Sequence, residues 1–219
     1  MSNDSRVAGL GKNRIEALTD GIFATAMTVL VISLSVPVIA TQQISTELIV
    51  DLKSLFPTVL GYVISFVVLA AYWIRHHNMF HYIARVDSRL LWLNILFLMT
   101  VGFIPFSTAL IGRYPLARIP VIIYGSNLIA TGLSLQALWV YSANRHQLIA
   151  PSLSERAVAR VNILMLIGTL GYAAAIIFAF INTMLSLAVY TIVPVFYIFL
   201  GIRRRQPTPR PTVQARPKR

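Results

Sequence analysis

Six long runs of apolar residues, separated by short polar stretches, account for most of the chain. They cover residues 15–37, 54–74, 90–112, 119–141, 158–180 and 184–202. Each is about as long as the 20 residues that an α-helix needs to cross the hydrocarbon core of a bilayer. Only residues 181–183 separate the last two runs, and a tight turn is expected there, because one helix over 158–202 would far exceed the bilayer. The pattern predicts an all-α, polytopic membrane protein with six transmembrane helices.

Composition supports a membrane location. Of the 219 residues, 57% are hydrophobic and 12% are charged, whereas soluble domains carry about 25% charged residues. A net charge of +12 first suggests nucleic acid. The basic residues, however, lie between the apolar runs and in the C-terminal tail, so we expect the lipid bilayer as partner and no nucleic acid. The chain contains no cysteine, which excludes disulfides and thiolate metal sites.

The basic residues also predict the direction of the spans. With the N-terminus inside, sixteen Lys and Arg residues fall on the cytoplasmic side, seven of them in residues 203–219, against three on the other side. Positive charge is enriched in cytoplasmic segments of membrane proteins. We therefore expect a multi-pass protein of the cell membrane with cytoplasmic N- and C-termini. Residues 1–203 would form the six-helix transmembrane domain, and residues 204–219 a basic, Pro-rich, disordered cytoplasmic tail.

The first run differs from the others because its cytoplasmic end carries charge. Arg14 and Asp20 are six residues apart, so they do not share a helix face and a direct ion pair between them is not expected. Ionisable groups inside a membrane are costly and are usually paired or functional. Asp20 is therefore expected to be buried and to find donors at the cytoplasmic end of the second run, among residues 75–78 at the start of the connection that follows it. A structural hydrogen-bond hub and a gate or proton site both remain open.

Small or weakly polar residues form a stripe further along the first run. Their spacing is i, i+4, i+7, i+11 and i+14, which places them within about 60° of one another on a helix. These residues are Gly21, Thr25, Thr28, Ile32 and Ser35. Small residues favour close helix packing in membranes, so the stripe is typical of a helix–helix seam. A pore lining formed by several copies of this helix is the alternative.

The start of the first run resembles a known signature. Residues 14–21, Arg-Ile-Glu-Ala-Leu-Thr-Asp-Gly, are similar to the RxxxFSDG motif that opens the first helix of the prokaryotic transmembrane protein 175 family, relatives of the lysosomal potassium channel. The similarity continues to residue 37 and resumes at residues 73–80, 87–94 and 105–106. It covers roughly the first half of the chain strongly and the rest by the pattern of spans.

The resemblance implies a homotetramer of six-helix subunits whose first helices line a central pore that passes K+ passively. It also implies a hydrophobic constriction in place of a carbonyl filter. Counted from Asp20, the bulky constriction residue of the family falls at Thr25 and its threonine at Thr28, with apolar pore positions at Val29 and Ile32. Together with the stripe, the expected pore-lining residues are Thr25, Thr28, Val29, Ile32, Gly21 and Ser35.

Three positions depart from the family pattern. Leu18 and Thr19 replace Phe and Ser of the motif conservatively. Thr25 is the larger departure, because the family usually has isoleucine or leucine there, and a threonine ring has less apolar bulk. We therefore expect the tightest point to shift toward Val29 and Ile32, with threonine oxygens contacting a partly dehydrated cation.

The histidines that follow the second run suggest a metal site, since His77 and His81 are four residues apart on one helix face. No cysteine completes a ligand set, and the only carboxylates that could are Asp87 and Asp20 from elsewhere, so a hydrogen-bonding role is favoured, with His77 meeting the first helix. The expected motif and gating network consists of Arg14, Leu18, Thr19, Asp20, His77 and Asn94.

Enzyme function is not expected, because the sequence has no Ser–His–Asp arrangement, phosphate loop or paired carboxylates within a span. We likewise expect no cofactor and no small-molecule substrate, only the permeant K+. Two alternatives to a potassium-preferring channel remain. One is a proton or mixed-cation leak through Asp20, the histidines and the threonines, and the other is a non-conducting membrane scaffold.

Overall fold

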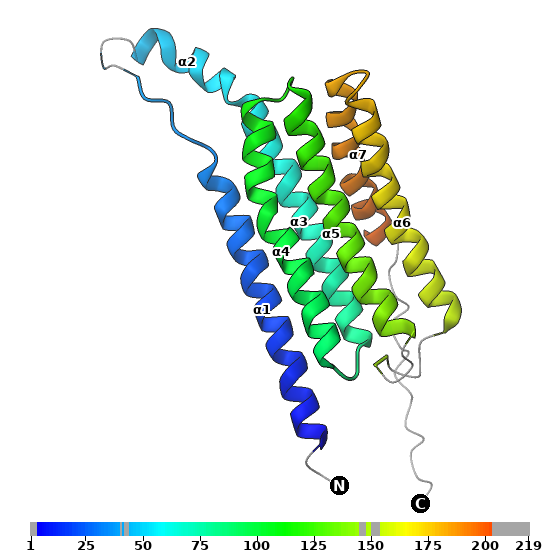
Figure 1. Ribbon diagram of the computed structural model, residues 1–219. Coiled ribbons are helices and arrows are strands. Elements are labelled where there is room, and N and C mark those ends of the chain that lie inside the picture. Colours follow the sequence, from blue (N-terminus) through cyan, green and yellow to red (C-terminus); the bar gives the residue numbers. More distant parts are fainter. Residues whose placement is uncertain (1–3, 40, 42–43, 145–147, 150–153, 203–219) are drawn as a thin grey trace, which may run out of the picture.

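The computed structural model of the protein describes residues 4–39, 41, 44–144, 148–149 and 154–202. Within these ranges the chain forms seven α-helices (Figure 1). They are α1 (Asp4–Ile32), α2 (Ile44–Ser54), α3 (Phe56–Tyr82), α4 (Ser88–Arg113), α5 (Arg118–Asn144), α6 (Glu155–Phe178) and α7 (Thr183–Ile202). The all-α class predicted from the apolar runs is confirmed.

Most of the long helices can cross a membrane. By length and composition five described segments qualify: one on α1, one on α2 with α3, and one each on α4, α5 and α6, while α7 provides a shorter apolar helix. Large apolar side chains remain exposed on their outer faces, as Ile163, Leu170 and Ile177 do on α6. A continuous apolar surface suits lipid rather than water. The protein is therefore a multi-pass membrane protein.

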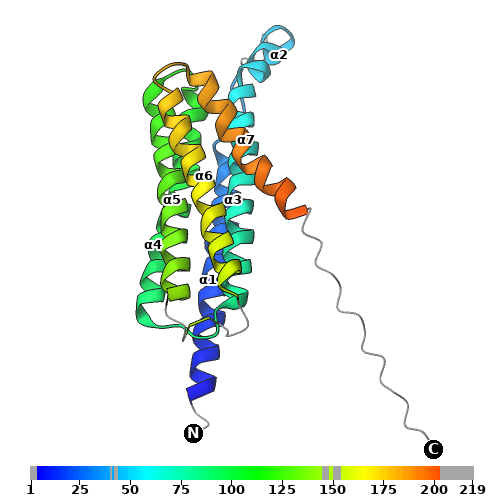
Figure 2. The same ribbon diagram turned by 90° about the vertical axis from the view of Figure 1, so that its right-hand side faces the viewer.

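The helices α3 to α7 pack into a bundle, and α1 lies along one side of it against α3 and α4 (Figure 1). The α2 helix contacts α3 at the end of the bundle where α1 stops. The α7 helix packs on α6 and α3, and its C-terminal part leans away from the bundle (Figure 2). Among the described residues, this arrangement leaves one side of α1 without a neighbouring helix.

The first helix is shorter than its apolar run, since α1 ends at Ile32 rather than at residue 37. The backbone N–H groups of Ser33 and Leu34 bond to carbonyls three residues earlier, at 3.3 and 3.0 Å, which tightens the final turn. Pro37 follows closely and disfavours helical backbone in the residue before it. The prediction that Ser35 continues the helical stripe is therefore wrong, because Ser35 lies in the non-helical segment 33–39.

Two connections also differ from the expectation. The polar stretch over residues 42–53 contains α2, and α3 continues to Tyr82, so Arg75 lies inside a helix rather than in a cytoplasmic connection. The tight turn between the last two spans is confirmed, and there the Asn182 side chain accepts a hydrogen bond of 2.8 Å from the backbone of Met184. The tail over residues 204–219, together with its expected boundary at 203, lies outside the described residues.

Two tyrosines hold α7 against glycines of its neighbours. Tyr190 donates a hydrogen bond of 2.9 Å to a backbone carbonyl of α5, and Tyr197 donates to the carbonyl of Leu164 on α6. A Cβ at Gly125 would lie 2.1 Å from the Tyr190 hydroxyl oxygen, and one at Gly168 would lie 2.6 Å from that of Tyr197. Such distances are far below van der Waals contact, so both hydroxyls reach their carbonyls only because these positions are glycine.

Candidate functional site

The α1 helix has one packed face and one open face. At 100° per residue, the packed stripe and the stripe of Gly21, Thr25, Thr28 and Ile32 point about 150° apart. All four residues of the second stripe are exposed. Within the described part of the chain, this stripe is therefore not a seam with another helix. The packed stripe, which faces α3 and α4, consists of Ile15, Thr19, Phe23, Ala26 and Leu30.

The apolar members of the open face differ in exposure. Ile32, at the end of α1, is 71% exposed, and Val29 is 40% exposed. At the other end of the stripe, a Cβ added to Gly21 would meet nothing within 4 Å. Along α1, the side chains of the open face therefore become bulkier, from the glycine at one end to a branched apolar side chain at the other.

The two threonines of the open face direct their protons into their own helix. Thr25 donates to the carbonyl of Gly21 and Thr28 to that of Ala24, both at 2.8 Å. A hydroxyl that donates in this way keeps its lone pairs as acceptors. No residue between Gly21 and Ile32 is ionisable. The open face thus offers oxygen acceptors without fixed charge, which suits weak contacts to a cation that has lost part of its hydration shell.

A buried hydrogen-bond chain connects the packed face of α1 to two other helices. Asn94 on α4 donates from its amide nitrogen to the Thr19 hydroxyl at 3.3 Å, and its amide oxygen lies 2.8 Å from Nε2 of His76 on α3. Because the amide nitrogen serves Thr19, the oxygen accepts from a protonated Nε2. All three side chains are at most 2% exposed. The expected participation of Thr19 and Asn94 in one network agrees with this geometry, but the histidine is His76 rather than His77.

Asp20 is held by a residue that the sequence analysis did not select. Its carboxylate accepts a hydrogen bond of 2.8 Å from the indole nitrogen of Trp73 on α3. The expectation that Asp20 is buried is wrong, because in the subunit it is exposed. The expected donor on the second run exists, but it lies within the helix at Trp73, outside residues 75–78. His77 takes part only indirectly, by stacking on the Trp73 ring with centroids 5.7 Å apart.

The remaining motif residues lie outside this network. Arg14 is exposed, and Leu18 is 48% exposed on the same side of α1 as the open stripe. Among the described residues, no group of three or more His, Cys, Asp or Glu side chains is placed to hold a metal ion. The three histidines of α3 have other contacts: His76 lies within hydrogen-bond distance of Asn94, His77 stacks on Trp73, and His81 meets the edge of Tyr82.

Trp73 could have been found from its chemistry, but spacing does not choose between the two histidines. Trp73 shares a helix face with His76, three residues later, and also with His77, four residues later. The indole nitrogen can only donate, and Asp20 is an acceptor at matching depth on α1. Which of the two histidines faces α1 depends on the rotation of α3 against α1, and the packed helices place His76 there, bonded to Asn94.

The sequence is similar to proteins of one family. The sequence profile of the family described as Endosomal/lysosomal potassium channel TMEM175 matches residues 14–105. A Streptomyces collinus protein described as a potassium channel is 33% identical over 190 residues, covering 85% of this chain and 91% of the relative. The human protein described as endosomal/lysosomal proton channel TMEM175 is 27% identical over 185 residues, covering 80% of this chain and 36% of the human protein.

The fold is similar to a solved structure as well. The crystal structure of a lysosomal potassium-selective channel TMEM175 homolog from Chamaesiphon minutus matches with a TM-score of 0.75 and 30% sequence identity. The match covers 87% of this chain and 98% of the other. It therefore extends well beyond the part of the chain that carries the signature motif.

Proposed function

Because the chain belongs to the transmembrane protein 175 family of ion channels, we propose that it is a potassium-preferring cation channel that conducts passively. The observation that carries this proposal is the open face of α1. It presents two threonine oxygens and exposed apolar side chains on the side that no other helix of the subunit covers. The potassium-channel description of the Streptomyces relative supports K+ as the preferred ion.

We propose further that four copies assemble with their α1 helices around a central pore. One helix cannot enclose a path for ions, so its open face becomes a pore lining only when several copies surround it. The charge asymmetry of the sequence supports cytoplasmic termini in the cell membrane. In this orientation Gly21 and Asp20 lie toward the cytoplasmic mouth, and Ile32 lies deeper along the pore.

The narrow part of the proposed pore lies between Thr25 and Ile32, over about 10 Å of helix. Threonine oxygens at Thr25 and Thr28 would contact the permeant ion. Ile32 supplies most of the apolar bulk, because it is more exposed on the open face than Val29. Ser35 lies beyond the end of α1 and is left out of the helical lining.

The direct test is flux through the purified protein in liposomes that carry a K+ gradient. We expect K+ efflux that exceeds Na+ efflux under matched gradients. No flux from a protein that runs as a folded tetramer would overturn the channel proposal in favour of a non-conducting scaffold.

A proton leak is the second candidate, favoured by the description of the human relative as a proton channel. The open face has no ionisable residue between Gly21 and Ile32, so protons would have to move along water. A pH-sensitive dye in the same liposomes separates the two candidates. Acidification that needs no permeant K+ and exceeds K+ flux would favour the proton leak.

Thr25 provides the sharpest test of the lining. Thr25→Ile adds apolar bulk and removes an oxygen, so we expect lower conductance and a changed K+/Na+ reversal potential. Val31→Ile is the matched control, because Val31 is 48% exposed and points about 90° away from the stripe. Unchanged conductance and selectivity in Thr25→Ile would remove Thr25 from the pore.

A further inference from the structure

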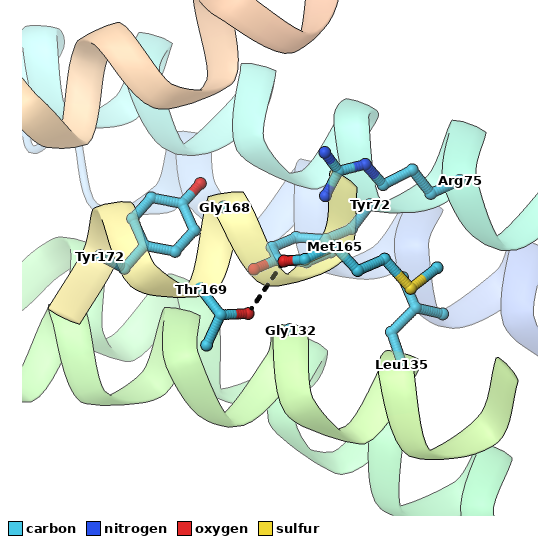
Figure 3. Close-up of a pocket in the computed structure, with 8 residues that line it drawn as sticks. All are labelled: Tyr72, Arg75, Gly132, Leu135, Met165, Gly168, Thr169 and Tyr172. Carbon is cyan, nitrogen blue, oxygen red and sulfur yellow. Dashed lines mark hydrogen bonds between the residues drawn. The ribbon is translucent and has the colours of Figure 1, made fainter. Parts of the chain in front are cut away.

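Two arginines of the subunit lie beside hollows of very different size. Arg75 lines a small cavity between α3, α5 and α6 (Figure 3), and its volume of about 10 Å³ is close to the minimum that holds one water molecule. Arg118, toward the opposite end of the bundle, lines an open groove of about 560 Å³, a volume typical of ligand sites. The cavity beside Arg75 has no room for a larger ligand, whereas the groove beside Arg118 does.

The groove lies where three helices of the bundle begin or end. The α5 helix begins at Arg118, α6 ends at Phe178 and α7 begins at Thr183. Both α5 and α6 are long and apolar enough to cross a membrane, so their ends lie near the level of the lipid headgroups. A ligand in this groove is therefore placed where the phosphate groups of the bilayer are concentrated.

The polar side chains that line the groove can all donate hydrogen bonds. Arg118 is exposed, and its guanidinium carbon lies 5.5 Å from the centroid of the Phe180 ring, a cation–π distance. The side-chain oxygen of Asn182 accepts from the backbone of Met184 at 2.8 Å, so its amide nitrogen remains as a donor. Thr183 adds a hydroxyl to the same groove. A guanidinium fork beside two further donors suits a phosphate oxyanion.

No carboxylate shares the groove. Of the seven acidic residues of the sequence, none is among the described residues that line it. The only two at this end of the bundle, Glu47 and Asp51, belong to α2. In both views α2 lies on the other side of this end from the turn between α6 and α7 (Figures 1 and 2). The charge of Arg118 is therefore not neutralised from within the groove.

We propose that this groove binds the headgroup phosphate of an anionic phospholipid. Its remaining walls include three large apolar side chains, Leu116, Ile119 and Ile181, all of which are largely exposed. Further along α6, Ile177 is exposed as well. Free phosphate gains nothing from such surfaces, whereas a phospholipid places its phosphate on Arg118 and its acyl chains along these side chains.

The position of the groove in the subunit agrees with a lipid ligand. The α1 helix packs on α3 and α4, whereas the groove lies on the α6 and α7 side of the bundle (Figure 1). In a tetramer with α1 at its centre, that side faces the surrounding bilayer. Only this last placement rests on the proposed function, because lipid binding to the groove does not depend on conduction.

The test is native mass spectrometry of the full chain in detergent, titrated with dioleoylphosphatidylglycerol or dioleoylphosphatidylcholine. We expect phosphatidylglycerol to bind several-fold more tightly, because the choline cation meets only donors in the groove. Arg118→Gln should weaken phosphatidylglycerol binding at least tenfold. Arg113→Gln is the matched control and should stay within twofold of wild type. Arg113 is exposed near the same end and lies 5.9 Å from the Tyr114 ring, but it does not line the groove.

A second variant and a competitor separate lipid from a free anion. Ile181→Gln keeps the donors but removes apolar surface, so it should weaken phosphatidylglycerol binding several-fold. Millimolar inorganic phosphate should not displace the lipid. Displacement by phosphate, or unchanged binding in Ile181→Gln, would show that the groove holds a free anion and would overturn the lipid assignment.

Two further results would overturn the site itself. One is phosphatidylglycerol binding at the wild-type level in Arg118→Gln. The other is a changed oligomeric state in that variant with lipid binding retained, which would make the groove an interface between copies of the chain. If Arg118→Gln does not fold, Arg118→Lys keeps the charge without the fork, and binding that is not reduced several-fold contradicts the site. Since no flux is measured, failure here is distinct from failure of the channel proposal.

Discussion

Small residues of α1 and of the α5–α6 pair have opposite surroundings. On α1, a Cβ at Gly21 would meet nothing within 4 Å. On α5 and α6, a Cβ at Gly125 or Gly168 would collide with a tyrosine hydroxyl at 2.1 or 2.6 Å. The same residue type therefore leaves a surface open in one region and admits a neighbouring side chain in the other. In membranes small residues usually lie where helices pack closely. Only the surroundings of each glycine show whether it leaves a surface exposed or makes room for a neighbouring side chain.

The subunit therefore has two kinds of region. The framework is the packed interior of the helical bundle, and the working surface is the open face of α1. Framework positions contribute to the stability of the subunit, because their side chains are buried in contact with neighbouring helices. Positions on the open face of α1 contribute little to that stability, and the proposed function requires that they act on the ion instead. Mutations in the two regions should therefore separate stability from conduction.

Gly125→Ala should have the largest effect on stability. The new Cβ would displace Tyr190 and break its bond to the carbonyl of Val121, which should cost about 3 kcal/mol of unfolding free energy. Unfolding in detergent measures the loss. Gly102→Ala is the control, because nothing lies within 4 Å of its Cβ, and it should cause no loss. Equal stability of both variants would contradict the packing described for α7.

Asn94→Leu should come next. The substitution removes the link between Thr19 and His76 and leaves buried polar groups unpaired, at a cost of about 1–3 kcal/mol. It should also reduce flux, since the packed face of α1 loses its polar anchor. Asn78→Leu, at an exposed position of α3, is the matched control and should change stability by less than about 0.5 kcal/mol. A loss of similar size in both variants would argue against a special role for the network.

Trp73→Phe should have a smaller effect. It keeps an aromatic ring but removes the 2.8 Å bond to Asp20, for which about 1 kcal/mol is expected. Trp92→Phe provides the comparison, because Trp92 is 68% exposed and should tolerate the change. Thermal unfolding in detergent, with flux measured in parallel, distinguishes the pair. If Trp73→Phe leaves both unchanged, the Asp20 bond does not position α1.

Thr28→Val should change stability least, within about 0.5 kcal/mol, because its side chain is exposed. It should nevertheless lower the K+/Na+ permeability ratio in liposomes, since an acceptor oxygen of the open face is lost. Thr131→Val makes the same exchange at a fully buried framework position, where we expect a loss of about 1 kcal/mol and no change in selectivity. The reverse pattern would place the working surface elsewhere.

Much of the fold follows from local patterns in the sequence. The apolar runs predicted the six long helices, and the motif over residues 14–21 pointed to the family that the comparisons bear out. The extra helix α2 was missed because Glu47, Asp51 and Lys53 made its segment resemble a polar connection. The end of α1 was missed because residues 33–39 remain apolar after the helical hydrogen bonds stop.

The site was predicted less completely than the fold. Thr19, from the motif, and Asn94, from the further similarity over residues 87–94, were selected and do share a bond, but Trp73 and His76 were not selected. Sequence position gives the depth of a residue along a span. It does not give the rotation of one helix against another, and that rotation decides which of two adjacent histidines faces α1.

The sequence by itself determined the membrane class, the presence of six long apolar helices and the angular position of the small-residue stripe, because hydropathy and helical periodicity are local properties. Only the tertiary structure showed that this stripe is the exposed face of α1. The same structure showed that tyrosines of α7 occupy the space beside the glycines of α5 and α6. It also placed Arg75 against Tyr197, 122 positions later in the chain. Such contacts depend on how whole helices pack, which a stripe of residues on one helix does not specify.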